Sequence, residues 1–313
     1  MLTKPFFSVV IPLYNKEKYI EATLLSVLNQ TFKNFEIIII NDGSQDNSIA
    51  IVQALNDPRI KLCSIENQGV SFARNLGIKN ARSNYIALLD ADDQWYPYHL
   101  QTMHDLIVDF PNKGLYCSRY EFVFKNIISK KSKLKDIPDL YRGPITDFFS
   151  SNLFDPIIHT SATVIPKHIF SEVNFFDTNL KSGQDTYLWI QIALKHDVVI
   201  SNAISSKFIK YANSLSKSQH TKGRIFILDK FKKQEENNSA FHKYMDMNRY
   251  AIALDYKIHN QQALSHSIYK AINKKNLNSK QKWLYGLPSL FIKHLYKLKN
   301  SLDHIGVFFH LYR

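Results

Sequence analysis

Short apolar runs alternate with amphipathic segments through the first ninety residues, and this alternation strongly limits how the chain can fold. The runs are rich in β-branched residues, as is typical of strands, and cover residues 7–13, 35–40, 60–65 and 85–89. The segments between them predict helices near residues 20–28, 48–55 and 71–81. Short connections in such a series favour parallel strands joined by right-handed crossovers. We therefore expect an α/β fold with a mostly parallel central sheet.

Three carboxylates follow the last of these apolar runs, at Asp90, Asp92 and Asp93. Like charges so close together raise one another's pKa, so they need a neutralising partner. Carboxylate oxygens suit Mg²⁺ or Mn²⁺, and the alternative is a solvated acidic turn or a helix N-cap cluster. Tyr14 and Asp42 also follow predicted strands, and ligands of parallel sheets bind at the carboxyl ends of the strands. We expect these polar groups to converge there, which favours the metal interpretation.

Composition sets broad limits. The chain has 313 residues, 45% of them apolar, which is enough for one large domain or two ordinary ones. Its two cysteines, Cys63 and Cys117, predict buried thiols in a reducing compartment. The N-terminus lacks the layout of a signal peptide, and no apolar run is as long as a membrane span. These features predict a cytoplasmic location.

The net charge of +13 is concentrated in the last third of the chain. Residues 1–204 hold 20 Lys and Arg against 21 Asp and Glu, a net −1, whereas residues 205–313 hold 20 against 6, a net +14. Amphipathic helices are expected from about Thr221, with a break at Pro288. These helices could lie on an anionic membrane surface, or pack on the N-terminal domain or a second subunit; nucleic acid is disfavoured, because no base-reading pattern accompanies the charge. Five lysines in residues 125–135 predict a solvated loop or a lid.

Six motifs, in this order and spacing, resemble the family 2 glycosyltransferases. The resemblance covers about residues 6–216, and its motifs lie at residues 9–15, 26–31, 41–46, 67–77, 89–93 and 183–189. It implies a GT-A fold, a nucleotide-sugar donor that is usually UDP-linked, a divalent metal and inversion at the anomeric carbon. It also implies a catalytic domain over residues 1–216, followed by a helical, basic region over residues 217–313.

The resemblance implies donor-binding roles for several residues. Tyr14 would stack on the base, with a packed core tyrosine as the alternative. Asp42 would accept a hydrogen bond from the uracil ring N–H, and an Asx-turn before Gly43 is compatible with that role. Arg74 would hold a phosphate or the base, with a surface salt bridge as the alternative. The other expected donor-binding residues are Pro12, Asn15, Asp90 and Ala91.

The resemblance also implies the metal ligand and the base. Asp92, with Asp93 beside it, would bind Mn²⁺ or Mg²⁺, which stabilises the charge that develops on the diphosphate. Asp185 would act as general base, with a helix N-cap as the alternative. Many relatives carry Glu where this chain has Gln184, so a charge beside the base is lost. The candidate acceptor residues are His159, Gln184 and Trp189, although a structural histidine is the alternative for His159. Lys210 or Asn213 would hold the diphosphate where many relatives have a histidine.

The resemblance thus implies a metal-dependent inverting hexosyl- or N-acetylhexosaminyl-transferase. It would move sugar from a UDP-sugar to a hydroxyl of a glycan acceptor, lipid-linked or not, for a capsule, lipopolysaccharide or related polysaccharide. A peripheral position on the inner face of the cytoplasmic membrane and a homo-oligomer stay open. One alternative is a sugar-nucleotide-binding module that has lost catalysis, which Gln184 favours. The other is a nucleotidyltransferase, whose Gly-rich phosphate loop is absent from residues 13–17.

Overall fold

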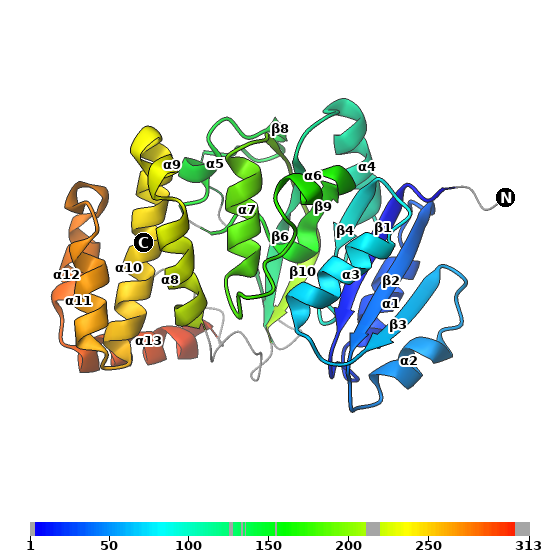
Figure 1. Cartoon of the computed structure of the whole chain (residues 1–313), viewed down its shortest axis with the longest axis horizontal. Coiled ribbons are helices and arrows are strands. Elements are labelled where there is room, and N and C mark those ends of the chain that lie inside the picture. Colours follow the sequence, from blue (N-terminus) through cyan, green and yellow to red (C-terminus); the bar gives the residue numbers. More distant parts are fainter. Residues whose placement is uncertain are drawn as a thin grey trace.

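A central sheet with helices on both faces forms the N-terminal two thirds of the molecule (Figure 1). The structure, a computed structural model, describes residues 4–124, 128–132, 134, 136–153, 155–210 and 220–303. Its strands are β1 (Phe7–Leu13), β2 (Phe35–Asp42), β3 (Ile60–Ile65), β4 (Tyr85–Leu88), β5 (Gln94–Trp95), β6 (Leu115–Phe124), β7 (Ile128–Lys131), β8 (Arg142–Pro144), β9 (Thr163–Pro166) and β10 (Val198–Lys210). Their order is β3-β2-β1-β4-β9-β6-β10-β5, with β7 beside β6 and β8 beside β10.

Most strands along this order point the same way. β1 is parallel to both β2 and β4, β2 is parallel to β3, and β6 is parallel to β10. β9 is antiparallel to both of its neighbours, β4 and β6, so β6 and β10 run in the direction of β4. The expected α/β fold with a mostly parallel sheet is therefore confirmed.

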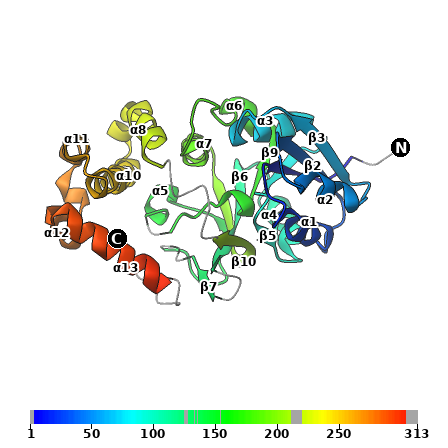
Figure 2. The same ribbon diagram turned by 90° about the horizontal axis from the view of Figure 1, so that it is seen from below.

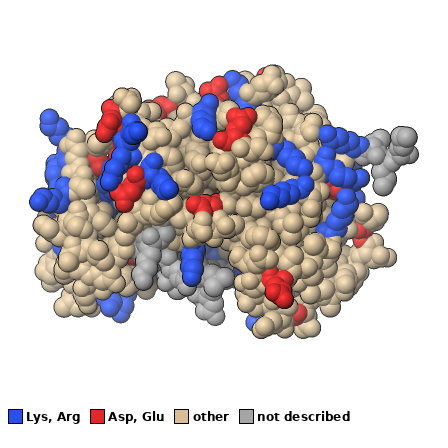
Figure 3. Space-filling view, viewed as in Figure 1, with Lys and Arg blue, Asp and Glu red and all other residues tan. Residues whose placement is uncertain are grey.

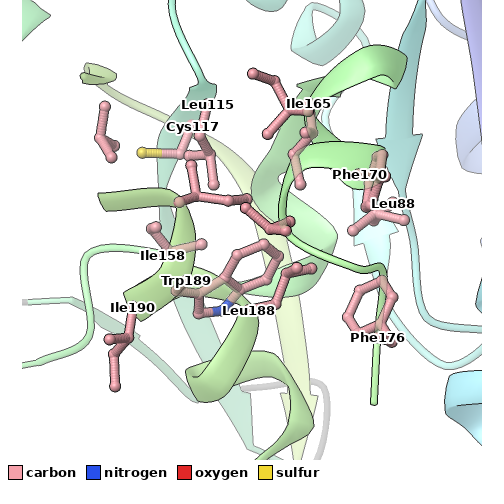
Figure 4. Close-up of a cluster of buried hydrophobic side chains, with 14 of the residues drawn as sticks. Leu88, Leu115, Cys117, Ile158, Ile165, Phe170, Phe176, Leu188, Trp189 and Ile190 are labelled. Carbon is pink, nitrogen blue, oxygen red and sulfur yellow. The ribbon is translucent and has the colours of Figure 1, made fainter. Parts of the chain in front are cut away.

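The two faces of the sheet bury two separate hydrophobic clusters, because successive strand residues point to opposite faces. Val10 and Leu88 belong to the cluster under α3, α6 and α7, whereas Val9 and Ile39 belong to the cluster under α1, α2 and α4. Figure 4 shows part of the first cluster. The helices of this part of the chain are α1 (Ile20–Leu28), α2 (Ser48–Ala54), α3 (Val70–Asn80), α4 (His99–Asp109), α5 (Phe148–Ser151), α6 (Lys167–Glu172) and α7 (Gln184–Ala193), with a 3₁₀ turn at Thr160–Ala162.

The C-terminal part is helical, as expected, and packs on the sheet domain. Phe241 and Tyr256 of α10 (Ser239–Ile258) join the hydrophobic cluster under α7, while Leu254, Leu284 and Ile292 belong to a third, smaller cluster. The predicted boundary near residue 216 falls within residues 211–219, outside the described residues. The helices are α8 (His220–Lys230), α9 (Lys232–Asn237), α10 (Ser239–Ile258), α11 (Gln262–Lys270), α12 (Ser279–Gly286) and α13 (Ser289–Asp303), with a 3₁₀ turn at Lys274–Asn276.

Some local predictions were wrong. The expected loop or lid at residues 125–135 contains β7, which pairs antiparallel with β6; its lysines suit a sheet edge, where charge discourages further pairing. The recurrence of His99, Met103 and Leu106 predicts a helix from Trp95, but α4 begins at His99, because Pro97 disfavours helical geometry in the residue before it. Residues 198–200 and 207–211 predict two closing strands, whereas the structure has the single strand β10, whose register shifts between Ser201 and Ser206. The expected break at Pro288 is confirmed, since it separates α12 from α13.

Candidate active site

The carboxyl ends of β2, β1 and β4 lie side by side at one edge of the sheet, and the predicted polar groups gather there. Tyr14 follows β1, Asp42 ends β2, and Asp90 follows β4 after one residue. The expected convergence of these groups is therefore confirmed. The ring of Tyr14 is exposed, which suits stacking on a ligand and does not fit the alternative of a packed core residue.

Arg74 joins two carboxylates from distant parts of the chain. Its guanidinium is buried at the end of the first turn of α3. Its Nη2 donates to Asp90 Oδ1 at 2.6 Å, and its Nη1 donates to Asp185 Oδ1 at 2.7 Å. The ring of Phe176 lies 5.2 Å from the guanidinium carbon. Arg74 is thus a buried, fixed cation between Asp90, a predicted donor-binding residue, and Asp185, the predicted base, and not a surface salt bridge.

The two carboxylates on Arg74 have opposite pKa shifts. Burial opposes ionisation of Asp90, but Arg74 outweighs it, so the pKa of Asp90 lies below its usual value. At Asp185 burial outweighs the attraction of Arg74, and the negative charge of Asp90 acts in the same direction as burial, so the pKa of Asp185 is raised. A raised pKa makes Asp185 the more basic of the two carboxylates, as a general base requires.

Asp185 lies at the start of α7, but it does not cap that helix. The N-cap residue is Gly183, whose φ of 78° lies in the left-handed region that favours glycine. Gln184 is the first residue of α7, and its buried Oε1 has no hydrogen-bond partner among the described residues. The N-cap alternative for Asp185 is therefore not what the structure shows.

Asp92 forms an ion pair with Lys16 from the loop after β1. Both side chains are partly exposed, and burial raises the pKa of Asp92 despite the lysine. No cluster of three or more His, Cys, Asp or Glu side chains suited to a metal ion occurs in the part of the chain that is described. Asp92 already faces a cation, and binding of Mg²⁺ or Mn²⁺ by Asp92 together with substrate phosphates stays a prediction. Ala91 is buried, and its carbonyl accepts a hydrogen bond from Thr23.

Asp93 turns into the protein. Its Oδ1 accepts a hydrogen bond from the backbone N–H of Ile209 at 3.1 Å, and its Oδ2 accepts one from Ser161. Burial and the nearby Asp90 and Asp92 raise its pKa well above the usual value. The structure thus separates Asp93 from the exposed side of Asp92 and gives it a bracing role between β10 and the 3₁₀ turn. Ser161, which sequence reasoning did not single out, also accepts a hydrogen bond from the Asp90 N–H.

His159 and Trp189 are packed residues. The ring of His159 lies between Phe208 and Tyr120, with centroid distances of 4.4 and 4.9 Å, and burial lowers its pKa to about 4. This arrangement is that of a neutral, structural histidine. Trp189 lies in the hydrophobic cluster near Phe176 (Figure 4), so the structure moves it from the candidate acceptor residues to the core.

Asp42 organises the loop that leads into α3. Its two carboxylate oxygens accept hydrogen bonds from the N–H groups of Gln68 and Gly69, at 2.7 and 2.9 Å. Gly43 follows with a φ of 76°, and a Cβ there would lie 3.0 Å from the backbone nitrogen of Asn67. Each carboxylate oxygen keeps a second lone pair, so Asp42 has room for a further hydrogen bond. The hydrogen bond from the uracil ring N–H stays a prediction.

The loop after β1 is fastened to the loop after β2. Asn15, with a φ of 49°, accepts a hydrogen bond from the Gln45 N–H at 2.8 Å and donates its own N–H to Ser44. Asn15 therefore fixes loop geometry and does not cap α1, which begins at Ile20. Pro12 lies in β1 beyond the last residue paired with β4. Lys210 ends β10, with its ammonium 4.5 Å from the centre of the Phe122 ring, and Asn213 lies outside the described residues.

The sheet, its crossover helices and the acidic edge define an α/β protein of the GT-A type. The sequence matches the family described as Glycosyl transferase family 2 over residues 8–170, and the chain belongs to this family. The structure is similar to that of S. aureus TarS 1–349 in complex with UDP-GlcNAc, with a TM-score of 0.67 over 97% of this chain and 93% of that one. Identity to TarS is 17%, so this likeness concerns the fold.

Curated relatives match about three fifths of the chain. An uncharacterized glycosyltransferase of Rickettsia felis is 38% identical over 199 residues, which are 61% of this chain and 31% of that protein. The minor teichoic acid biosynthesis protein GgaA of Bacillus subtilis is 31% identical over 207 residues, which are 60% of this chain and 43% of GgaA. The match thus spans less than half the length of each of these two relatives.

Proposed function

We propose that the protein is a metal-dependent inverting glycosyltransferase that moves a hexose or N-acetylhexosamine from a UDP-sugar to a hydroxyl of a glycan acceptor. The observation that carries this proposal is the buried guanidinium of Arg74, which holds Asp90 and Asp185 together at the carboxyl edge of the sheet. Support for the donor comes from a protein of the same fold, TarS, which was crystallised with UDP-GlcNAc and with UDP. Support for a cell-surface polysaccharide comes from the relative GgaA, named for teichoic acid biosynthesis.

The donor would be held by residues of the acidic edge. The exposed ring of Tyr14 would stack on the uracil, and Asp42 would accept the hydrogen bond of the ring N–H. Asp90, ionised beside Arg74, would bind the ribose hydroxyls. Asp92 would exchange the ammonium of Lys16 for a divalent cation, which supplies charge stabilisation to the diphosphate. Lys16, once released, would remain close enough to contact a phosphate.

The acceptor would be activated by Asp185. Its carboxylate takes the proton of the acceptor hydroxyl as that oxygen forms its bond to the anomeric carbon. The bond between the anomeric carbon and the diphosphate oxygen breaks on the opposite side, and its electron pair leaves with UDP. Attack and departure on opposite faces invert the anomeric carbon. Arg74 keeps the base in place, and burial keeps its pKa raised.

We further propose that the acceptor is lipid-linked and that the protein works at the inner face of the cytoplasmic membrane. Among the described residues no helix is both long and apolar enough to cross a membrane. A peripheral position would bring a soluble donor and a membrane-bound acceptor to the same site.

The decisive experiment is a donor-turnover assay that measures UDP release from a panel of UDP-sugars, with and without acceptor glycans. We expect release by the native protein and a loss of about 10²–10⁴-fold in Asp185→Asn, since the amide cannot take the proton. Asp197→Asn, which alters an exposed carboxylate paired with Lys113, is the matched control and should retain turnover. UDP binding without turnover of any donor would instead favour the second candidate, a sugar-nucleotide-binding module, which the unpaired Gln184 Oε1 supports.

A further inference from the structure

The last two helices carry an apolar strip that no core of the described chain uses. α13 packs inward through Ile292 and, partly, Leu295. Leu290, Phe291 and Leu298 lie on its other side, with 66, 64 and 53% of their surfaces exposed. At 3.6 residues per turn these three fall within an arc of about 100° that excludes Ile292. Trp283 of α12 is 62% exposed, and we call these four residues the α12–α13 strip.

The strip stands in a basic setting. Residues 279–302 contain five lysines and no Asp or Glu. Lys282, Lys293 and Lys297 are exposed, and the last two lie beside the strip on the helical wheel of α13. Apolar and aromatic side chains bordered by lysines are typical of helices that lie in the interface of an anionic membrane.

Other occupants fit this surface less well. A second copy of the chain, related by twofold symmetry, would bring two sets of lysines against each other. Nucleic acid would satisfy the lysines but leave the large apolar side chains against a polar backbone. An anionic lipid surface satisfies both, because acyl chains cover the apolar residues and headgroup phosphates receive the ammonium groups.

α13 and the carboxyl ends of the central strands lie on the same side of the molecule. In Figure 1 the arrowheads of β1, β2 and β10 point downward, and α13 runs along the lower side. Figure 2, seen from below, shows α13 at one end of the molecule and β2 toward the other, with β10 between them. A surface under α13 would therefore face the carboxyl edge of the sheet. Figure 3 shows basic side chains over the C-terminal helices on a neighbouring face as well.

We propose that the α12–α13 strip docks the protein on an anionic lipid surface, with its apolar side chains among the acyl chains and its lysines at the headgroup phosphates. Docking in this orientation turns the candidate active site toward the membrane. The presence of an acceptor there rests on the proposed function, whereas the docking itself does not require catalysis.

Flotation with lipid vesicles tests this proposal on the full-length chain. Vesicles contain equal parts of phosphatidylglycerol and phosphatidylcholine, or phosphatidylcholine alone. We expect the native protein to float with the anionic vesicles and binding to weaken about tenfold or more in Lys293→Glu/Lys297→Glu. Leu290→Ser/Phe291→Ser should weaken binding by a similar factor or more, because two large apolar side chains no longer insert.

Matched controls separate the strip from general charge and apolar surface. Lys33→Glu/Lys243→Glu changes the net charge equally outside α12 and α13, and Val108→Ser removes an exposed apolar side chain on α4. Both should float like the native protein. Circular dichroism melting shows that each variant is folded, independently of nucleotide binding.

Three results would overturn the proposal. One is a native protein that stays with the free fraction in the presence of anionic vesicles. Another is equal flotation of the strip variants and the controls. The third is a native protein that sediments as a dimer while Leu290→Ser/Phe291→Ser sediments as a monomer. That result would assign the strip to contact with a second copy of the chain. Because none of these readouts involves UDP, they are independent of the proposed transferase activity.

Discussion

Arg74 is buried at the candidate active site, where Asp90 and Asp185 share its guanidinium. A planar guanidinium can donate to two carboxylates at once from fixed directions, which an ammonium cannot do. Removing this cation would leave two half-buried carboxylates near each other without a counter-ion, so Arg74 serves both stability and placement. We regard it as a positioning residue, because it would act on the reaction through Asp185.

Arg74→Lys tests this role. Lysine keeps the positive charge but lacks the planar N–H groups that bind both carboxylates. We therefore expect kcat/KM for donor and for acceptor to fall about tenfold or more. Asp185 works as a base when ionised, and weaker stabilisation of that form raises its pKa further. The acid limb of the pH profile of kcat/KM should therefore move to higher pH. Arg82→Lys, beside Glu36 at the opposite end of the sheet, is the control and should leave the acid limb unchanged. The same pH profile in both variants would contradict the positioning role of Arg74.

Sequence reasoning found the residues of this site but not their arrangement. Asp90, Asp92, Asp42 and Tyr14 were predictable, because each follows an apolar strand and parallel strands end together. The sequence did not predict that Asp90 and Asp185 share Arg74. Asp185 is distant from both residues in the sequence, and its position depends on how α7 packs. Asp93 and Trp189 show the same limit: spacing places a residue near a site, but packing decides which way its side chain points.

At the scale of elements, the central strands were predicted more accurately than the edge strand β7 and the loops. The bounds of β1 and β3 agree with the predicted runs at residues 7–13 and 60–65, because strands that pack against helices need apolar residues on the covered face. β7 could not be predicted in this way, since a lysine-rich edge strand owes its pairing to a neighbour and not to its own composition. The loops fastened by Asn15 and Asp42 likewise depend on partners 30 and 26 residues away.

Gly77 sets the distance between α3 and β1. A Cβ at this position would lie 2.5 Å from Cγ1 of Val10, a stiff side chain in a central strand. Gly77→Ala should therefore lower the free energy of unfolding by about 1–3 kcal/mol, although alanine favours a helix by about 1 kcal/mol. Urea denaturation measures this loss. Gly286→Ala, whose Cβ would meet nothing within 4 Å, is the control, and equal stability of the two variants would contradict the account.

At the scale of the whole molecule, the basic helices are joined to the sheet domain. Phe241 of α10 is fully buried, and its ring lies 4.5 Å from that of Phe149 of α5. The sequence predicted helices here and left their packing open, because amphipathicity shows that a helix has a buried face but not what covers it. In the structure α10 packs on the sheet domain, whereas α13 has a second apolar face that is exposed.

Phe241→Ala should destabilise the whole chain. The cavity should cost about 3–5 kcal/mol, whereas Phe226→Ala, at a ring that is 39% exposed, should cost much less. Because one hydrophobic cluster spans both parts, tryptophan fluorescence and far-ultraviolet circular dichroism should report a single transition in urea. Separate transitions, with the helices of Phe241→Ala unfolding first, would show that the two parts are independent.

The central claim is that the acidic edge of the sheet is a metal-dependent nucleotide-sugar site, and calorimetric titration of UDP tests it most directly. We predict binding in Mn²⁺ that weakens about tenfold or more in EDTA, and an Asp92→Asn variant whose weak binding Mn²⁺ no longer strengthens. Asp105→Asn, at an exposed carboxylate on α4, should bind like the native protein. UDP affinity that is the same in Mn²⁺ and in EDTA, or absent in both, would contradict the account.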